Sequence, residues 1–156
     1  MTSKPTKPDS LPDLECACAT VRRAARLVTQ LYDEELRPDL EAPQFALLSV
    51  LERRPGASQA VLARMLGFDK TTISRNLRLV ERKGWVEPSP GGDQRERGFR
   101  LTLAGGELLR AAKPRWRRAQ ERLRSAMTSV EWQRMWQGLR GLGDAAYSAR
   151  HQNGGI

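Results

Sequence analysis

The sequence is poor in the residue types on which most enzymes and metal sites depend. Its 156 residues include one histidine and two cysteines, and the histidine, His151, lies near the C-terminal end. Transition-metal sites need several Cys or His ligands at short spacing, and catalysis needs a constellation of acids, bases or nucleophiles that this sequence does not show. The composition therefore predicts neither an enzyme nor a metal or cofactor site.

Long apolar runs are also missing. No stretch of about 18 apolar residues occurs, as a membrane-spanning helix would require. The first residues, MTSKPTKPDSLPD, lack the apolar segment of a secretory signal and predict a disordered lead-in over residues 1–12. We expect a cytoplasmic protein that does not enter a membrane, in which Cys16 and Cys18 are free thiols.

Positive charge is in excess and is unevenly distributed. The chain has 27 Lys and Arg against 18 Asp and Glu, a net charge of +9. Residues 1–40 carry 6 basic and 7 acidic side chains, whereas residues 69–100 carry 8 and 5 and residues 104–126 carry 7 and 2. This excess favours a polyanionic partner that binds the middle of the chain.

Residues 59–80, QAVLARMLGFDKTTISRNLRLV, have the pattern of two short amphipathic helices joined by a tight turn. Ser58 is a good N-cap for the first helix and Asp69 for the second, and Gly67 permits the turn between them. Three apolar positions of the second helix recur at helical spacing and face inward: Ile73, Leu77 and Val80. The pattern predicts a helix-turn-helix whose second helix presents cations and hydroxyls to the major groove of DNA.

A β-hairpin is predicted directly after this unit. Lys83 and Gly84 end the helix, residues 85–87 are extended up to Pro88, and residues 99–103 alternate apolar and polar as a half-buried strand does. The segment between them, SPGGDQRERG, is too rich in Gly and Pro for a helix or a core strand. Its arginines predict a basic wing beside the reading helix.

Together these motifs resemble the MarR family of bacterial transcriptional regulators over residues 44–105. The matching residues are Leu62, Ala63, the run Asp69 to Arg75, Leu77, Glu81, Gly84, Trp85, Val86, Asp93, Arg95, Leu101, Thr102 and Gly105. The resemblance implies a mainly α fold with a small β-hairpin wing. It also implies a homodimeric repressor that binds an inverted repeat in double-stranded DNA and is released by a small molecule or by thiol oxidation.

The resemblance assigns DNA contacts to Thr71, Thr72 and Arg75 of the reading helix and to Arg95 of the wing, with Asp93 orienting Arg95. The full set of predicted DNA-binding residues is Lys70, Thr71, Thr72, Ser74, Arg75, Arg78, Asp93, Arg95 and Arg97. An RNA- or protein-binding winged helix is the alternative. The reading face has no exposed aromatic residue on which RNA bases would stack, which favours duplex DNA.

Amphipathic helices are predicted on both sides of the DNA-binding unit. Residues 14–36 carry a narrow apolar seam, and a second seam follows the capping box that begins at Thr128. The two seams are expected to pair. A long helix over residues 103–127 should kink at Pro114. The arginines of its RWRRAQERLR segment are expected to form a solvated basic face, and long-range attraction of DNA is the alternative. We expect this organisation: N-terminal dimerisation helix 13–42, winged helix-turn-helix 43–104, C-terminal dimerisation helices 105–150 and flexible tail 151–156.

Cys16 and Cys18 are the candidate redox residues. Two positions apart on one helix they would point about 200° apart, so neither a shared ligand nor a disulfide fits unless that turn unwinds. Cys18 lies on the seam and is either a small core residue or a sensor of oxidants or electrophiles; capture of a metalloid by both thiols is a third reading. Cys18 and Tyr32 match in spacing the reactive pair of the hydroperoxide-sensing MarR regulators, but Arg22 replaces their second tyrosine.

Overall fold

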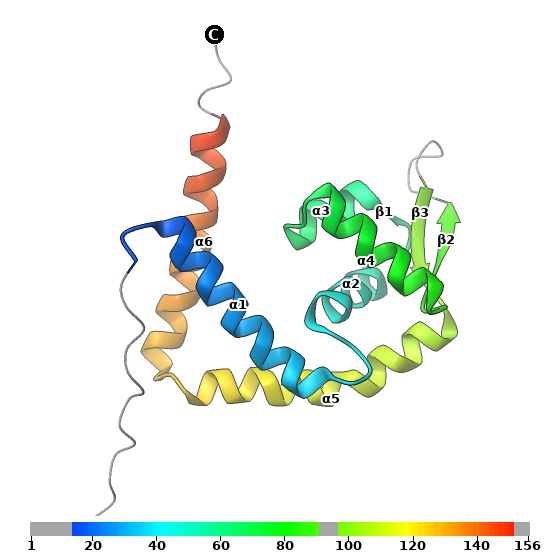
Figure 1. Ribbon diagram of the computed structural model, residues 1–156, viewed down its shortest axis with the longest axis horizontal. Coiled ribbons are helices and arrows are strands. Elements are labelled where there is room, and N and C mark those ends of the chain that lie inside the picture. The colour runs from blue at the N-terminus through cyan, green and yellow to red at the C-terminus, as the bar shows by residue number, and fades with distance from the viewer. Residues whose placement is uncertain (1–13, 91–96, 152–156) are drawn as a thin grey trace, which may run out of the picture.

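The computed structural model describes residues 14–90 and 97–151. The elements follow in the order α1 (Ala17–Leu36), α2 (Ala42–Arg53), β1 (Ala57–Ser58), α3 (Gln59–Leu66), α4 (Lys70–Arg82), β2 (Val86–Pro90), β3 (Arg97–Leu101), α5 (Leu103–Ser125) and α6 (Ser129–His151). One lobe holds α2, α3, α4 and the strands. Helix α6 lies apart from this lobe, whereas α1 reaches it at its C-terminal end, where Leu36 joins the core (Figure 1). Helix α5 connects the two parts.

The core of the lobe forms around α2, whose residues 44–51, QFALLSVL, are nearly all apolar. Leu47, Leu48 and Leu51 of α2 are completely buried. They belong to one apolar cluster with residues of the surrounding helices, namely Leu62 of α3, Ile73, Leu77 and Val80 of α4, and Leu109 of α5. The inward face predicted for the second helix of the helix-turn-helix is thereby confirmed.

The wing belongs to a three-stranded antiparallel sheet of order β1–β3–β2. Strand β1 was not predicted, because its two residues, Ala57 and Ser58, become a strand only by pairing with Phe99 and Gly98 of β3. The prediction that Pro88 closes the first strand is wrong. Pro88 lies within β2, opposite Phe99, and an edge strand tolerates a residue without an N–H group.

Both strands of the hairpin extend further toward its tip than the sequence predicted. Ser89 and Pro90 pair with Gly98 and Arg97, all four of which had been assigned to the loop. The second strand ends at Leu101, because Thr102 caps α5 by accepting a hydrogen bond from the Gly105 N–H at 3.1 Å. Leu103, which was predicted both to end that strand and to begin the following helix, is the first residue of α5. Its side chain is 80% exposed.

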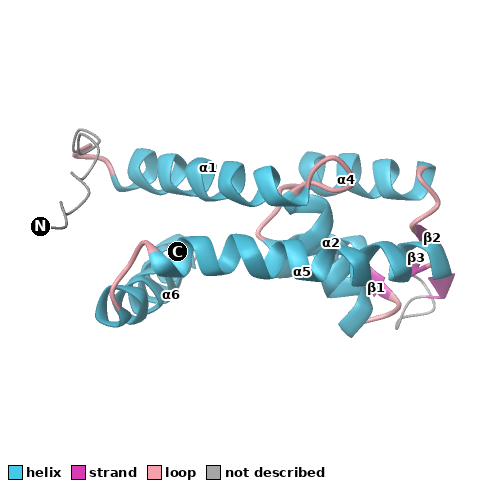
Figure 2. Ribbon diagram, turned by 90° about the horizontal axis from the view of Figure 1, so that it is seen from below, coloured by secondary structure: helices cyan, strands magenta, loops and turns pink. Residues whose placement is uncertain are grey.

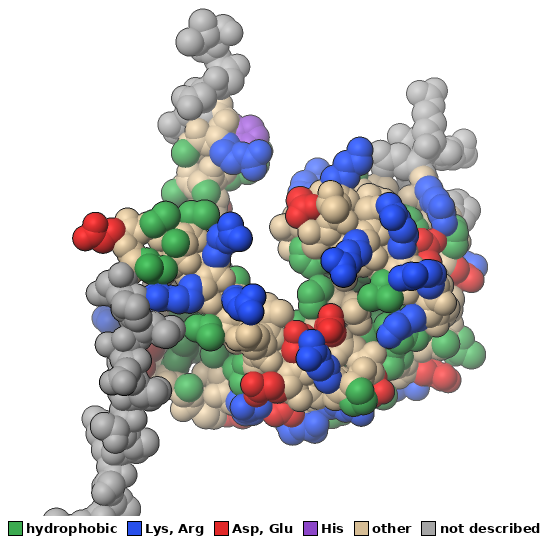
Figure 3. Space-filling model, viewed as in Figure 1, with side chains coloured by type: hydrophobic (Ala, Val, Ile, Leu, Met, Phe, Trp, Pro, Cys, Tyr) green, Lys and Arg blue, Asp and Glu red, His purple; other side chains and the backbone are tan. Residues whose placement is uncertain are grey.

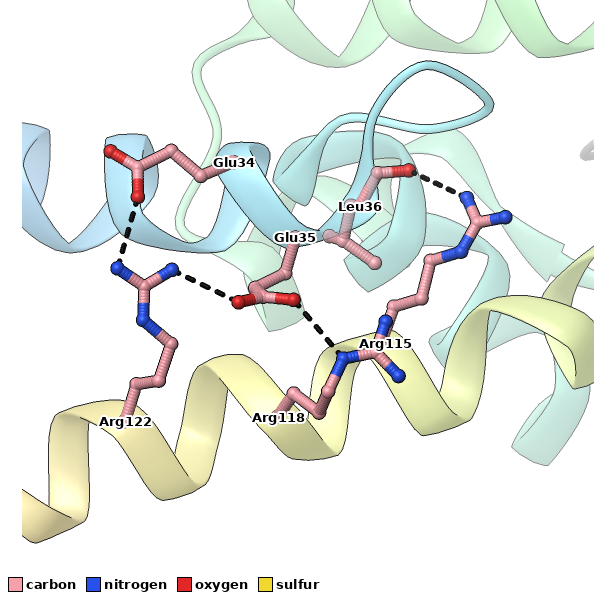
Figure 4. Close-up of polar contacts among 6 residues, drawn as sticks. All are labelled: Glu34, Glu35, Leu36, Arg115, Arg118 and Arg122. Carbon is pink, nitrogen blue, oxygen red and sulfur yellow. Dashed lines mark hydrogen bonds and ion pairs between the residues drawn. The ribbon is translucent and has the colours of Figure 1, made fainter.

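Helix α5 is bound to α1 by a ladder of ion pairs. Arg122 contacts Glu35 at 3.0 Å and Glu34 at 3.2 Å, and Arg118 contacts Glu35 at 3.2 Å (Figure 4). Arg115 continues the ladder with a 2.6 Å contact to Asp39 and a 3.4 Å hydrogen bond to the carbonyl oxygen of Leu36. The Arg122 and Arg118 hydrogen bonds lower the pKa of the Glu35 carboxyl.

This ladder corrects the prediction that the arginines of α5 form only a solvated face. Glu34 and Glu35 hold part of that face, so α1 packs along α5 rather than along α6 (Figure 2). Each exposed pair is worth little alone, but several on one face align two helices. Pro114 lies inside α5 without ending it, and the helix changes direction along its length (Figure 1).

Helix α6 begins at the predicted capping box. The Thr128 N–H donates to Glu131 Oε2 at 2.8 Å, and the Glu131 N–H donates to Thr128 Oγ1 at 3.2 Å. The structure describes every residue of Ser129–His151, and none of them is buried. The exposed large apolar side chains of α6 are Val130, Trp136, Leu139, Leu142 and Tyr147. Residues 14–90 and 97–151 therefore leave the apolar face of α6 uncovered.

Candidate nucleic-acid interface

Two capped helices and a left-handed glycine build the turn before the reading helix. The Val61 N–H donates to Ser58 Oγ at 3.4 Å, which caps α3. Gly67 ends α3 with φ 66°, a conformation that side chains other than Gly rarely adopt. The Thr72 N–H then donates to Asp69 Oδ1 at 2.8 Å and caps α4. All three predicted roles are confirmed, and together they fix the angle at which α4 leaves the lobe.

The carboxylate of Asp69 accepts a second hydrogen bond. Thr72 Oγ1 donates to Asp69 Oδ2 at 2.7 Å, and this side-chain bond is the main reason why the pKa of Asp69 lies below its ordinary value, ahead of the backbone bond from Thr72. The predicted DNA contact Thr72 therefore uses its proton for the cap. Its hydroxyl oxygen keeps only acceptor capacity for a partner.

The cap predicts how stability depends on pH. Because the folded-state pKa of Asp69 is below its unfolded value, its stabilising effect is present above the unfolded pKa and is lost as the pH falls through the folded pKa. Asp69→Ala should lower the Tm at neutral pH and lose less on acidification than the parent does. Asp69→Asn is the control, since Asn caps about as well but does not titrate. Thermal unfolding at neutral pH and at about pH 3 measures both effects.

The outer face of α4 is cationic. Lys70, Thr71, Arg75 and Arg78 are exposed, while Thr72 and Ser74 are half-buried. Arg78 Nη2 donates to Ser74 Oγ at 3.0 Å, so these two predicted contacts form one unit. Lys and Arg side chains gather over α4 on the face of the lobe shown in Figure 3. The structure thus brings the predicted α4 residues together on one surface.

The wing residues are only partly described. Asp93 and Arg95 lie outside the described residues, so their predicted roles stay predictions. Arg97 is described: its Nη2 atom lies 2.7 Å from Glu81 Oε1 of α4, and its guanidinium lies 5.4 Å from the centre of the Phe99 ring. Sequence reasoning named Arg97 as a DNA contact and missed Glu81, although an acid among the arginines of the reading helix was a visible signal.

The two cysteines were predicted to lie on one helix, but only Cys18 does. Cys16 precedes α1 in an extended conformation, so the prediction that the helix includes Cys16 is wrong, whereas Cys18 lies in the first turn of α1. The helix was predicted to begin at Leu14, and it begins three residues later, at Ala17. Both thiols are exposed. They are therefore accessible to a reagent in a single chain.

Tyr32 does not face Cys18 within one chain. Fourteen residues of helix place them about 21 Å apart along α1. The Tyr32 hydroxyl instead donates to the side-chain oxygen of Gln120 on α5, and burial raises the pKa of Tyr32. A contact between Cys18 and Tyr32 would have to form between two chains.

A small cavity lies beside Tyr32, between α1, α2 and α5. Its volume is about 230 Å³, and the rings of Phe45 and Trp116 stack at its wall with centroids 5.8 Å apart. The other lining residues are Val28, Thr29, Leu36, Ala42 and Ala46. The site suits a small, flat, largely apolar molecule. Its lining combines the consecutive helices α1 and α2 with Trp116 of α5, which is distant in sequence, so no local motif could have predicted it.

Neither a metal site nor a membrane span is found in the described part of the chain. Residues 14–90 and 97–151 contain no group of three or more His, Cys, Asp or Glu side chains that could hold a metal ion. None of the helices there is both long and apolar enough to cross a membrane.

Comparison with known proteins agrees with this geometry. The sequence model of the MarR family matches residues 39–96. The transcriptional regulator HosA of Escherichia coli O157:H7 is 33% identical over 87 residues, which span 55% of this chain and 64% of HosA. The chain therefore covers less than two thirds of that relative's length.

Solved structures extend the similarity to most of the chain. The M. tuberculosis transcriptional regulator MosR, crystallised with DNA, is 37% identical, with a TM-score of 0.76 over 87% of this chain and 99% of MosR. The PcaV regulator of Streptomyces coelicolor, crystallised with its natural ligand, is 24% identical. It shares the fold with a TM-score of 0.75 over 88% of this chain and 99% of PcaV.

Proposed function

Because the chain belongs to the MarR family of winged-helix transcriptional regulators, we propose that it represses transcription by binding an inverted repeat in duplex DNA as a homodimer. The observation that carries the proposal is the surface of α4. Its inner face is fixed by buried Ile73 and Leu77, and its outer face presents Arg75 and Arg78. A helix held in this way can place side chains against base edges in the major groove.

The second protomer is inferred from the uncovered apolar faces of α1 and α6. On α1, Val21, Leu27 and Val28 are 38–46% exposed, and on α6 Trp136 and Leu142 are each 42% exposed. Exposed apolar faces of this kind are typical of an interface. They lie away from the lobe that carries α4 (Figure 1), so a dimer formed through them leaves both reading helices free.

Selection from random duplex DNA followed by gel shift tests the proposed function. We expect the selected duplex to be bound in the presence of excess single-stranded DNA or RNA competitor. If single-stranded RNA competes as well as the selected duplex, the chain is instead an RNA-binding winged helix. If neither nucleic acid binds, a protein-interaction module is the better description.

Cys18 is proposed as the thiol through which an oxidant releases the DNA. Its thiolate would attack a hydroperoxide, giving a sulfenic acid on Cys18 and releasing the alcohol. Cys18 is exposed in the single chain and lies in the first turn of α1, three residues before exposed Val21. Added oxygen at a packed dimer contact would force the helices to repack, and the spacing of the two lobes would change.

Hydroperoxide is therefore expected to lower the affinity of the parent protein for its selected duplex by about tenfold or more. Cys18→Ser should bind the same duplex and ignore the oxidant, as a gel-shift titration with and without cumene hydroperoxide would show. Cys16→Ser is the matched control, since it removes a second exposed thiol two residues away. A Cys18→Ser protein as sensitive as the parent would contradict the assignment.

A small-molecule inducer is the second candidate, supported by the cavity beside Tyr32. The stacked Phe45 and Trp116 rings and the Tyr32 hydroxyl suit a flat ligand with one polar group. The fold of PcaV, which was crystallised with its natural ligand, is the same. A ligand that releases DNA from Cys18→Ser as well as from the parent would support this route.

A further inference from the structure

The Glu81–Arg97 contact places an acid within the surface proposed to meet DNA. Glu81 lies on α4 beside Arg75, Arg78 and Arg82. A carboxylate there repels phosphates and lowers affinity for every DNA sequence. DNA attraction therefore does not explain Glu81, whose partner in the structure is Arg97 of the wing.

The contact crosses a groove. A hollow of about 640 Å³ separates α3 and α4 from the start of β3, and both Glu81 and Arg97 line it. Glu81 Oε1 lies 2.7 Å from Arg97 Nη2, and the Glu81 side chain is only 24% exposed. At this end of the hairpin, α4 and β3 are thus joined by side chains across an open space.

Arg97 is held from a second direction. Its guanidinium lies over the ring of Phe99, which is 4% exposed and belongs to the core of the lobe. A planar cation that stacks on a fixed ring loses less freedom when it also pairs with a carboxylate. The Glu81–Arg97–Phe99 chain therefore links the reading helix to the core through the tip end of β3.

We propose that Glu81 and Arg97 are positioning residues that set the wing relative to α4, and that they determine sequence specificity rather than gross affinity. The proposal rests on the proposed DNA binding. It changes the role of Arg97 from a phosphate or groove contact to a structural link. It also gives the carboxylate among the arginines of the reading helix a structural role.

Glu81→Gln distinguishes a positioning role from a charge effect. Loss of the charge should raise the affinity for the selected duplex, whereas loss of positioning should lower it. Loss of a negative charge alone should tighten binding to all duplexes in parallel. Loss of positioning should lower the ratio of specific to non-specific affinity by about fivefold, while non-specific affinity stays level or rises. Fluorescence-anisotropy titration of the selected duplex and of a scrambled duplex, at one salt concentration, gives this ratio.

Glu87→Gln is the matched control. Glu87 also pairs with an arginine of β3, Arg100, at 2.7 Å, but it lies on β2 and links only the two strands of the hairpin. Its substitution should leave the ratio unchanged. The exchanged pair, Glu81→Arg with Arg97→Glu, should recover part of the ratio that either single change loses.

This inference would be overturned if the parent binds the selected duplex and Glu81→Gln leaves the ratio of specific to non-specific affinity unchanged. That result would leave the proposed function intact. An equal loss in Glu87→Gln would also overturn the inference. A parent protein without preference for any duplex would overturn both.

Discussion

Arg75→Ala is expected to weaken binding to the selected duplex by about tenfold to a hundredfold and to relax the preference at one base pair. Arg75 is exposed on α4, one residue before half-buried Asn76 and two after buried Ile73. The helix cannot roll without exposing Ile73 and Leu77, so the guanidinium keeps a fixed approach to the groove. Arg75→Ala would remove the base contact that is proposed for this side chain.

Arg110→Ala is the control for charge. Arg110 is equally an exposed arginine, but it lies on α5. Its loss should weaken all duplexes slightly and to the same extent through the general field of the protein. Titration of the selected duplex and of single-base variants distinguishes the two. Equal losses from Arg75→Ala and Arg110→Ala, without altered preference, would mean that α4 does not read bases.

Gly105→Ala is expected to give a large loss of stability. A Cβ at Gly105 would lie 1.9 Å from the carbonyl oxygen and 2.8 Å from the carbonyl carbon of Trp85, both backbone atoms. Thr102 holds the backbone of Gly84 and Trp85 in place. Its N–H donates to the Trp85 oxygen at 3.1 Å and its hydroxyl to the Gly84 oxygen at 2.6 Å. This backbone cannot move away without breaking these bonds.

We therefore expect Gly105→Ala to lower the free energy of unfolding by about 3 kcal/mol, at the upper end of overpacking costs. Gly106→Ala is the control in the same turn of α5, because nothing lies within 4 Å of the added Cβ. It should be neutral or stabilising by up to about 1 kcal/mol, as Ala favours a helix. Urea unfolding at one protein concentration compares them, and similar curves for the two variants would refute the close contact.

Local signals in the sequence predicted the parts of the fold that depend on neighbouring residues. The caps at Ser58 and Asp69, the turn at Gly67 and the inward face of α4 all follow from the identity and spacing of residues within one or two turns of helix. The capping box at Thr128 is of the same kind. These are the features that position the reading surface.

The features that the sequence did not reveal depend on partners distant along the chain. Strand β1 exists because β3 pairs with it, and Pro88 is accepted in β2 because that strand is at the edge. The pairing of α1 with α5 depends on which arginines Glu35 meets across 83 and 87 residues. The Glu81–Arg97 contact likewise joins a helix to a strand, and neither residue predicts the other from sequence spacing.

The pairing of both reading helices with one duplex is best tested by hydroxyl-radical footprinting on the DNA that the protein selects. A homodimer with α4 in successive major grooves should protect two inverted half-sites whose centres lie about 34 to 36 Å apart, one turn of B-DNA. Protection should appear on both half-sites at the same protein concentration. A single protected half-site, bound at full affinity by one protomer, would contradict the proposed dimer and its reading of an inverted repeat.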